Sequence, residues 1–197
     1  AKALSEYYAK NYPKVRLFNL TRSGYAGSQR YSVFPRTGEV KSSWSGLRAQ
    51  LPIMLTLSMS GIPYVHSDIG GFAENSRNEE LLIRWAQLGV FSPIFRMYGD
   101  KNSPDLYQCS QETQKIMREL INLSYSLMPY IYTMAYQQAT SGKPLVRPLM
   151  YVHDDHYLMD IYDMYYFGDN MLVAPILDPG ATSRRVELPF GQWINYY

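Results

Sequence analysis

Residues 60–72 read Ser-Gly-Ile-Pro-Tyr-Val-His-Ser-Asp-Ile-Gly-Gly-Phe, and this stretch decides the fold class. A short apolar run, Ile62 to Val65, stands between Gly61 and a polar segment that begins at His66. An apolar run of this length, bounded by turn-forming residues, is typical of a buried β-strand. When such strands are parallel and joined by helices, functional side chains lie on the loops that follow them. The segment therefore predicts a strand of a parallel sheet with a polar, glycine-containing loop at its end.

The same alternation of short apolar runs and longer helical patterns extends on both sides of this strand. We predict strands at residues 15–20, 31–34, 62–65 and 93–97, with helices between Ser43 and Gly61, over 78–90 and over 111–140. Strands that alternate with helices favour a parallel sheet with helical crossovers. Four such units make half of a (β/α)8 barrel, so the fold class is α/β.

The helix at 111–140 is the longest element that the sequence predicts. Its apolar residues recur every three or four positions, as an amphipathic helix requires: Ile116, Leu120, Leu123, Leu127, Ile131 and Met134. We expect Pro129 to bend this helix and Gly142 to cap its C-terminus. Ser42 and Ser43 supply the capping chemistry for the start of the helix that ends near Gly61.

The pattern changes after residue 143. Short strands are predicted at 145–152, 171–176, 185–188 and 193–197, separated by turns such as Gly168-Asp169-Asn170. We therefore divide the chain into residues 1–143, half of a catalytic barrel, and residues 144–197, the first strands of an antiparallel β-sandwich domain.

The composition excludes several classes of function. A net charge of +2 over 197 residues provides no basic field for nucleic acid. The most apolar stretch, residues 51–65, falls short of a membrane span, so no membrane partner is expected. Cys109 is the single cysteine, which excludes an internal disulfide and a zinc cluster but leaves the compartment open. No cofactor is predicted, because the chain has neither a phosphate-binding glycine loop nor a dinucleotide fingerprint.

Polar residues follow each predicted strand of the barrel half. They are Arg22 after the first strand, Arg36 to Glu39 after the second, His66 to Phe72 after the third, and Arg96 to Tyr98 in the fourth. Each has a structural alternative: Glu39 would also be favourable as a charge at a helix N-terminus. We interpret His66, beside Asp68, as a hydrogen-bonded structural histidine. Spacing alone leaves a polar pocket and a set of solvated loops equally open.

The segment His153-Asp154-Asp155-His156 offers potential metal ligands. It falls in a polar loop between predicted strands, and metal sites need a closed ligand set with a supporting shell. No metal site is therefore predicted.

Five blocks carry a resemblance to a known family: RSGYAGSQRY, SSWSGLRAQL, SGIPYVHSDIGGF, ELLIRWAQLGVFSPIFR and LMPYIYTMAYQQATSGKPLVRPL. Together they resemble successive blocks of glycoside hydrolase family 31, which contains α-glucosidases and α-xylosidases. The later GDNMLVAPIL and VELPFGQWINYY resemble the start of that family's β-sandwich domain. The resemblance covers essentially the whole chain. It implies the second half of a (β/α)8 barrel, so we expect a missing N-terminal half of the barrel as a partner.

The resemblance also implies a retaining mechanism with two carboxylates, acting on an α-linked oligosaccharide or glycoside. The family's nucleophile lies in a motif that this sequence lacks, so the chain alone is expected to be inactive. The acid/base block, usually Trp-x-Gly-Asp, reads Arg36-Thr37-Gly38-Glu39 here, which implies that Glu39 is the catalytic acid/base.

Six further residues are implied to bind substrate. Arg22 resembles the arginine that contacts the sugar, and Asp68 and Phe72 resemble residues that line the sugar subsite. Arg96 resembles an arginine two positions before a sugar-binding histidine. Tyr98 stands in place of that histidine, and Arg36 stands in place of a pocket tryptophan.

The departures at positions 36, 39 and 98 favour an alternative, a catalytically impaired member of the same family that binds carbohydrate. A carboxylate retained at position 39 argues for the enzyme. The sugar, the linkage, and the choice between hydrolysis and glycosyl transfer stay open at this point.

Overall fold

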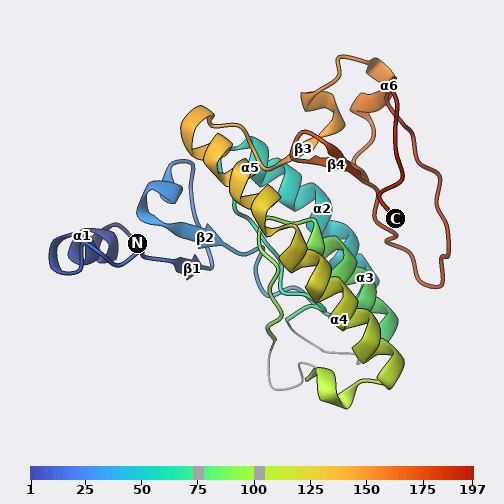
Figure 1. Ribbon diagram of the computed structural model, residues 1–197, viewed down its shortest axis with the longest axis horizontal. Helices are drawn as coiled ribbons and strands as arrows, with labels where there is room; N and C mark the ends of the chain where they lie inside the picture. Colours follow the sequence, from blue (N-terminus) through green and yellow to red (C-terminus); the bar gives the residue numbers. More distant parts are fainter. Residues whose placement is uncertain (73–77, 100–104) are drawn as a thin grey trace.

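The computed structural model describes residues 1–72, 78–99 and 105–197 (Figure 1). The chain up to Ser141 contains α1 (Lys2–Asn11), β1 (Asn19–Thr21), η1 (Ser28–Tyr31), β2 (Val33–Pro35), α2 (Trp44–Met59), α3 (Glu79–Val90), η2 (Leu106–Gln108), α4 (Gln111–Ser126) and α5 (Met128–Ser141). The rest of the chain contains β3 (Val146–Pro148), η3 (Leu149–Tyr151), α6 (His156–Met159), β4 (Tyr165–Phe167) and β5 (Met171–Val173).

The two parallel strands of the barrel half are β1 and β2, paired with Asn19 opposite Val33 and Thr21 opposite Pro35. The predicted third strand is reduced to one parallel bridge between Arg36 and His66. Its hydrogen bonds are Thr37 N to His66 O at 3.0 Å and His66 N to Pro35 O at 3.4 Å. The prediction of a strand at 62–65 was therefore wrong in extent, and Pro63 gives the reason, because proline cannot donate to a ladder.

The predicted strand at 93–97 was also wrong, since no strand is assigned there. This segment is joined to the loop after His66 by a hydrogen bond from Ile69 N to Arg96 O at 3.0 Å. Pro93, at the start of this segment, again lacks the donor that a ladder needs. The predicted strand at 31–34 is displaced by the 3₁₀ turn of η1, so that pairing begins at Val33.

Helix α2 lies as the sequence predicts. The Ser43 side chain caps its N-terminus by accepting a hydrogen bond from Gly46 N at 3.0 Å. Its buried face carries Leu47, Leu51, Met54 and Leu55. The helix ends at Met59, and Gly61 follows with a φ of +80°.

Helix α3 begins after Asn78, whose side chain accepts from Leu81 N, and it packs against α4. Glu79, in the first turn of α3, holds the start of α4. Its carboxylate accepts from Ser110 N at 2.8 Å and from the hydroxyls of Ser110 and Thr113 at 2.5 Å each. These hydrogen bonds lower the pKa of Glu79.

The predicted helix at 111–140 is two helices, α4 and α5, with Leu127 between them. The expectation of one bent helix was wrong because Pro129 stands in the first turn of α5. Proline is favoured there, since that position needs no intrahelical donor. Leu127 N still donates to Leu123 O at 3.1 Å, so α4 and α5 follow each other closely (Figure 1). Gly142 caps α5 with a φ of +76°, as predicted.

The second region contains a three-stranded antiparallel sheet in the order β3-β4-β5. Strand β4 is entirely buried, and the sequence analysis missed it because Tyr165-Tyr166-Phe167 has no alternation of polar and apolar residues. The predicted strand at 145–152 ends at Pro148 and continues as η3, and the one at 171–176 ends at Val173. The predicted strands at 185–188 and 193–197 were wrong, since those residues form neither helix nor strand.

One continuous core joins the two regions. It contains Trp85 of α3, Leu51 of α2 and Phe167 of β4. Hydrogen bonds reinforce it: Tyr165 Oη donates to Phe91 O at 2.8 Å, and Ser58 Oγ donates to Val146 O at 2.8 Å. Within the described part of the chain, no helix is both long and apolar enough to cross a lipid bilayer.

Candidate active site

The order of the sheet brings the ends of three chain segments together. Arg22 follows the last residue of β1, and Arg36 follows the last residue of β2, where its N–H donates to Thr21 O at 3.0 Å. The bridge from Arg36 to His66 then places Asp68 beside this edge. The hydrogen bond from Ile69 N to Arg96 O adds the fourth segment. Each residue therefore stands at the carboxyl end of its segment, where a (β/α)8 barrel carries its chemistry.

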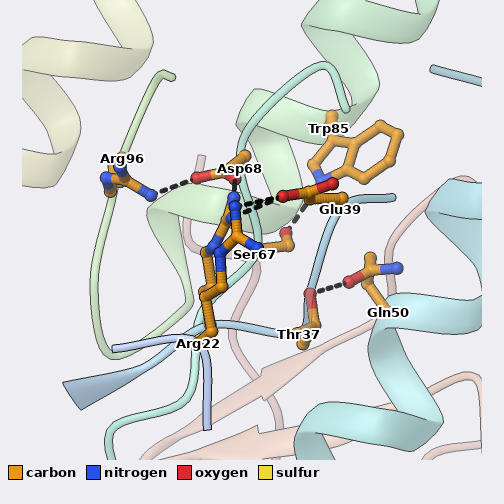
Figure 2. A network of polar contacts seen from close by, with 9 residues as sticks. Arg22, Thr37, Glu39, Gln50, Ser67, Asp68, Trp85 and Arg96 are labelled. Atoms are coloured by element: carbon orange, nitrogen blue, oxygen red, sulfur yellow. Dashed lines mark hydrogen bonds and ion pairs between the residues drawn. The ribbon is translucent and has the colours of Figure 1, made fainter. Parts of the chain in front are cut away.

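Glu39 is held by two guanidinium groups on one of its carboxylate oxygens. Arg22 Nη2 lies 2.5 Å from Glu39 Oε1, and Arg36 Nη2 lies 3.4 Å from the same atom. Figure 2 shows the Arg22 side chain reaching up to the Glu39 carboxylate. The Glu39 side chain is 44% exposed and Arg22 is 75% exposed, so solvent reaches this end of the network. An ion pair this exposed stabilises the fold little.

Asp68 forms the buried centre of the network. Its side chain is 1% exposed, and its two oxygens face different arginines. Arg36 Nη1 donates to Oδ2 at 2.6 Å, and Arg96 Nη1 donates to Oδ1. A buried carboxylate is tolerated only when charge and hydrogen bonds compensate it, and two guanidiniums meet both needs here.

Two aromatic rings cover these arginines. The Arg36 guanidinium carbon lies 4.7 Å from the centre of the Phe72 ring, and that of Arg96 lies 4.3 Å from the Tyr98 ring. The two rings stack on each other with centroids 6.0 Å apart. Cation–π contacts of this kind fix the guanidinium planes and are stronger where water is excluded. The structure thus brings all seven predicted site residues into one connected set.

Two hydrogen bonds that the sequence did not indicate fix the loops of Thr37 and Ser67 to helices α2 and α3. Thr37 Oγ1 donates to Gln50 Oε1 of α2 at 2.5 Å, and Trp85 Nε1 of α3 donates to Ser67 Oγ at 2.8 Å (Figure 2). The partners lie 13 and 18 residues apart in the sequence. The signal that could have indicated the first of them is a glutamine on the apolar face of a helix, since Gln50, at 3% exposed, needs a hydrogen-bond partner.

Gly70 and Gly71 allow the loop after His66 to turn tightly. Their φ values are +88° and +83°. A Cβ on Gly71 would lie 2.6 Å from Ser42 Cα, a distance that no side chain can occupy. The close approach lets Phe72 N donate to Val40 O at 2.7 Å, which ties this loop to the one that carries Glu39.

His66 precedes Asp68 by two residues, and its surroundings differ from those that the sequence predicts. It is 1% exposed, and neither ring nitrogen has a hydrogen-bond partner among the described residues. Burial agrees with the interpretation of His66 as a structural histidine, but the described residues show no hydrogen bond of ordinary geometry to its ring. Burial, together with the nearby Arg96 guanidinium, lowers the pKa of His66 to about 4, although the Asp68 carboxylate partly offsets both. The ring is neutral at pH 7.

The remaining candidates contribute nothing to this set. His153 Nε2 lies 2.7 Å from the Tyr166 hydroxyl, and the described residues contain no group of three or more potential metal ligands. A hollow of about 220 Å³ borders Arg22 and Arg36 and is floored by Ile53 and Leu57 of α2. Neither Glu39 nor Asp68 lines it, so we do not assign the substrate to it.

Chemically, the arrangement presents a half-exposed carboxylate, anchored through one oxygen, beside a buried arginine-carboxylate cluster with aromatic walls. Such a carboxyl can exchange a proton with a bound molecule, and the walls can bind a sugar ring. Among the described residues, the only other carboxylate in the network is that of Asp68. Both of its oxygens are paired with arginines.

Comparisons with known proteins agree with this arrangement. The model of the glycosyl hydrolases family 31 TIM-barrel domain matches residues 1–134, and the model of the family's C-terminal domain matches residues 142–197. These matches confirm the predicted fold class, part of a (β/α)8 barrel followed by a further domain. The exact boundary between residues 143 and 144 stays a prediction.

Individual relatives fall in the same group. Alpha-glucosidase 2 of Bacillus thermoamyloliquefaciens is 37% identical over 92% of this chain, and the alpha-xylosidase of Saccharolobus solfataricus is 36% identical over 92%. These alignments cover 23% and 26% of the two relatives, so the chain spans about a quarter of their length.

Solved structures give the same result. A GH31 alpha-xylosidase from a soil metagenome, complexed with xylose, superposes with a TM-score of 0.89 and 32% identity, covering 96% of this chain and 32% of its own. The Flavobacterium johnsoniae GH31 dextranase, complexed with glucose, gives a TM-score of 0.88 and 32% identity over 95% of this chain and 24% of its own.

Proposed function

This chain belongs to glycoside hydrolase family 31, and we propose that it supplies the second half of the catalytic barrel of a retaining α-glycosidase, with Glu39 as the acid/base. The observation that carries the proposal is the position of Glu39, at a strand end and anchored through Oε1 by Arg22 and Arg36. The chain spans about a quarter of its relatives, and the rest of the barrel supplies the nucleophilic carboxylate.

The reaction takes place in two steps. The upstream carboxylate attacks the anomeric carbon while Glu39 gives its proton to the leaving glycosidic oxygen, so the C–O bond breaks without releasing an alkoxide. In the second step, Glu39 removes a proton from water, or from a sugar hydroxyl, as that oxygen displaces the enzyme carboxylate. Two inversions give net retention of the α configuration.

The other residues bind and orient the sugar. Before substrate binds, Arg22 and Arg36 orient Glu39 through Oε1, and these contacts loosen as the protonated carboxyl donates to the substrate. Asp68 is buried, and its two oxygens fix Arg36 and Arg96 beside the position of the sugar. Phe72 and Tyr98 form the apolar wall that a pyranose ring packs against.

The substrate is an α-linked glycoside or oligosaccharide. Support comes from the solved relatives, whose structures were determined with xylose and with glucose. The α-linkage follows from the relatives named α-glucosidase and α-xylosidase.

A second candidate is a member of the family that binds carbohydrate without cleaving it. The observation that favours it is that both carboxylates already have guanidinium partners: Glu39 has Arg22 and Arg36, and Asp68 has Arg36 and Arg96. Substrate binding must loosen the Glu39 contacts before a proton can be transferred.

Replacing Glu39 with glutamine in the full-length protein that contains this chain tests the proposal. General acid catalysis is typically worth roughly 10²–10⁴ in rate. Glu39→Gln should lower turnover of glycosides with poor, alkoxide-like leaving groups by about that factor, whereas 4-nitrophenyl α-glycosides need little protonation and should lose much less in the first step.

The matched control is Glu119→Gln, an exposed glutamate on α4, which should change neither rate. If Glu39→Gln leaves both substrate classes unaffected, Glu39 is only a charge near a helix terminus. Carbohydrate binding by the wild-type protein with no turnover of any α-glycoside supports the second candidate instead.

A further inference from the structure

The charges of the site point to a substrate class that the family assignment does not specify. We propose that the site takes glycosides whose terminal sugar carries an oxyanion, and that Arg36 selects for that charge. The proposal rests on the function proposed above and concerns the same site.

The first argument is the charge balance of the network. Among the residues that the structure describes, the network contains three guanidiniums, of Arg22, Arg36 and Arg96, and two carboxylates, of Glu39 and Asp68, which gives +1. When Glu39 carries the proton that it donates, the same five groups sum to +2. A single upstream nucleophilic carboxylate reduces this to +1. A neutral sugar leaves that charge uncompensated, and a sugar with one negative charge balances it.

The second argument is the place and hydrogen-bonding capacity of Arg36. Its side chain is 10% exposed and lies under the Phe72 ring, where water screens charge poorly. A guanidinium has five N–H donors, and the contacts to Asp68 and Glu39 use one each from Nη1 and Nη2. Three donors then have no hydrogen bond to a described residue, and the planar guanidinium fits a two-oxygen anion.

The third argument concerns Arg22, which is 75% exposed and which, among the described residues, pairs with Glu39 as its one charged partner. A substrate oxyanion that binds Arg22 and Arg36 replaces the Glu39 carboxylate as their counter-ion. Glu39 can then hold its proton without leaving two guanidiniums unpaired. The negative charge of the substrate thereby favours the protonated form of Glu39 that the reaction needs.

The oxyanion could belong to a uronic acid or to a sulfate or phosphate ester, because guanidinium recognises all three. The first experiment therefore measures kcat/KM of the full-length wild-type protein on 4-nitrophenyl α-D-glucoside, α-D-glucuronide, and the 6-sulfate and 6-phosphate of the glucoside. We expect at least one anionic substrate to exceed the glucoside by about tenfold or more, the discrimination that one hydrogen bond to a charged group provides.

Inhibition gives an independent readout. D-Glucuronate, or the matching sulfated or phosphorylated glucose, should inhibit the protein at a concentration about tenfold below that of D-glucose. A protein that cleaves the neutral glucoside best and binds D-glucose best overturns the inference and leaves the proposed function intact. A protein that cleaves no α-glycoside of either charge contradicts the proposed function itself.

Variants of Arg36 assign the preference to this residue. Arg36→Met removes the charge and keeps the length, and it should lower kcat/KM for the anionic substrate about 10- to 100-fold more than for the neutral one. Arg36→Lys should retain part of the preference because it keeps the charge. Arg48→Met is the matched control: Arg48 is exposed on α2, pairs with Asp178 at 2.6 Å, and should leave the ratio unchanged.

If Arg36→Met does not fold, the wild-type substrate ratio and the Arg36→Lys variant decide the question. An anionic preference that survives undiminished in Arg36→Met contradicts the assignment to Arg36.

Discussion

Acid should destabilise this protein through His66, and replacing His66 with glutamine should remove that sensitivity. The ring is 1% exposed and lacks a hydrogen-bond partner among the described residues, and its pKa is lowered from 6.5 to about 4. The unfolded chain therefore takes up a proton on His66 at a higher pH than the folded chain does. Between pH 6.5 and pH 4 the unfolded state binds more protons, so the free energy of unfolding falls as the pH is lowered.

The size of this loss follows from the two pKa values. Each pKa unit corresponds to 1.36 kcal/mol, so the interval from 6.5 to about 4 is worth roughly 3 kcal/mol, all of it lost by about pH 4. Urea unfolding of the wild-type protein and of His66→Gln, from pH 7 to pH 4, measures the difference between their pH profiles. The exposed His156, replaced in the same way, is the control. Parallel profiles for wild type and His66→Gln would refute the reasoning.

Two further replacements test the network and its loop. Asp68→Asn removes the carboxylate that compensates two guanidiniums. It should lower the free energy of unfolding by about 3–5 kcal/mol, as breaking a buried ion pair does. A loss below about 1 kcal/mol in chemical denaturation would show that Asp68 does not hold the network as described. Gly71→Ala combines a φ of +83° with a Cβ only 2.6 Å from Ser42 Cα. It should cost at least about 2 kcal/mol and lower kcat, whereas Gly142→Ala, with a φ of +76° but open space around it, should cost stability alone and leave kcat unchanged.

Local signals made the helices predictable. The capping residues Ser43 and Gly142 lie where the sequence placed them, because a cap depends on residues within one turn. The break at Leu127 was missed because apolar periodicity continues across it, while Pro129 fits equally well as a kink or in a first turn.

Strands depended on partners that local sequence does not reveal. The apolar runs at 62–65 and 93–97 look like strands, yet Pro63 and Pro93 restrict their pairing to single contacts. The buried strand β4 was missed for the opposite reason, since its neighbours on both sides are other strands and its residues do not alternate.

The membership of the candidate site was predictable, but its internal pairing was not. The resemblance and the strand ends together indicated all seven residues. The sequence did not indicate that Arg36 links Glu39 to Asp68, because that link spans 32 residues and depends on the sheet register. The burial of His66 without a hydrogen bond of ordinary geometry to any described residue was likewise a property of packing.

The most direct test of Glu39 as the acid/base is the product that Glu39→Ala forms with azide in the full-length protein. In a retaining α-glycosidase the covalent intermediate has the β configuration, and a small anion needs no general base to attack it. With 4-nitrophenyl α-glycoside as substrate, azide should restore turnover and yield the α-glycosyl azide, identified by the anomeric proton in the NMR spectrum. A β-glycosyl azide would identify Glu39 as the nucleophile, and undiminished hydrolysis without any azide product would place the acid/base elsewhere; either result would contradict the account.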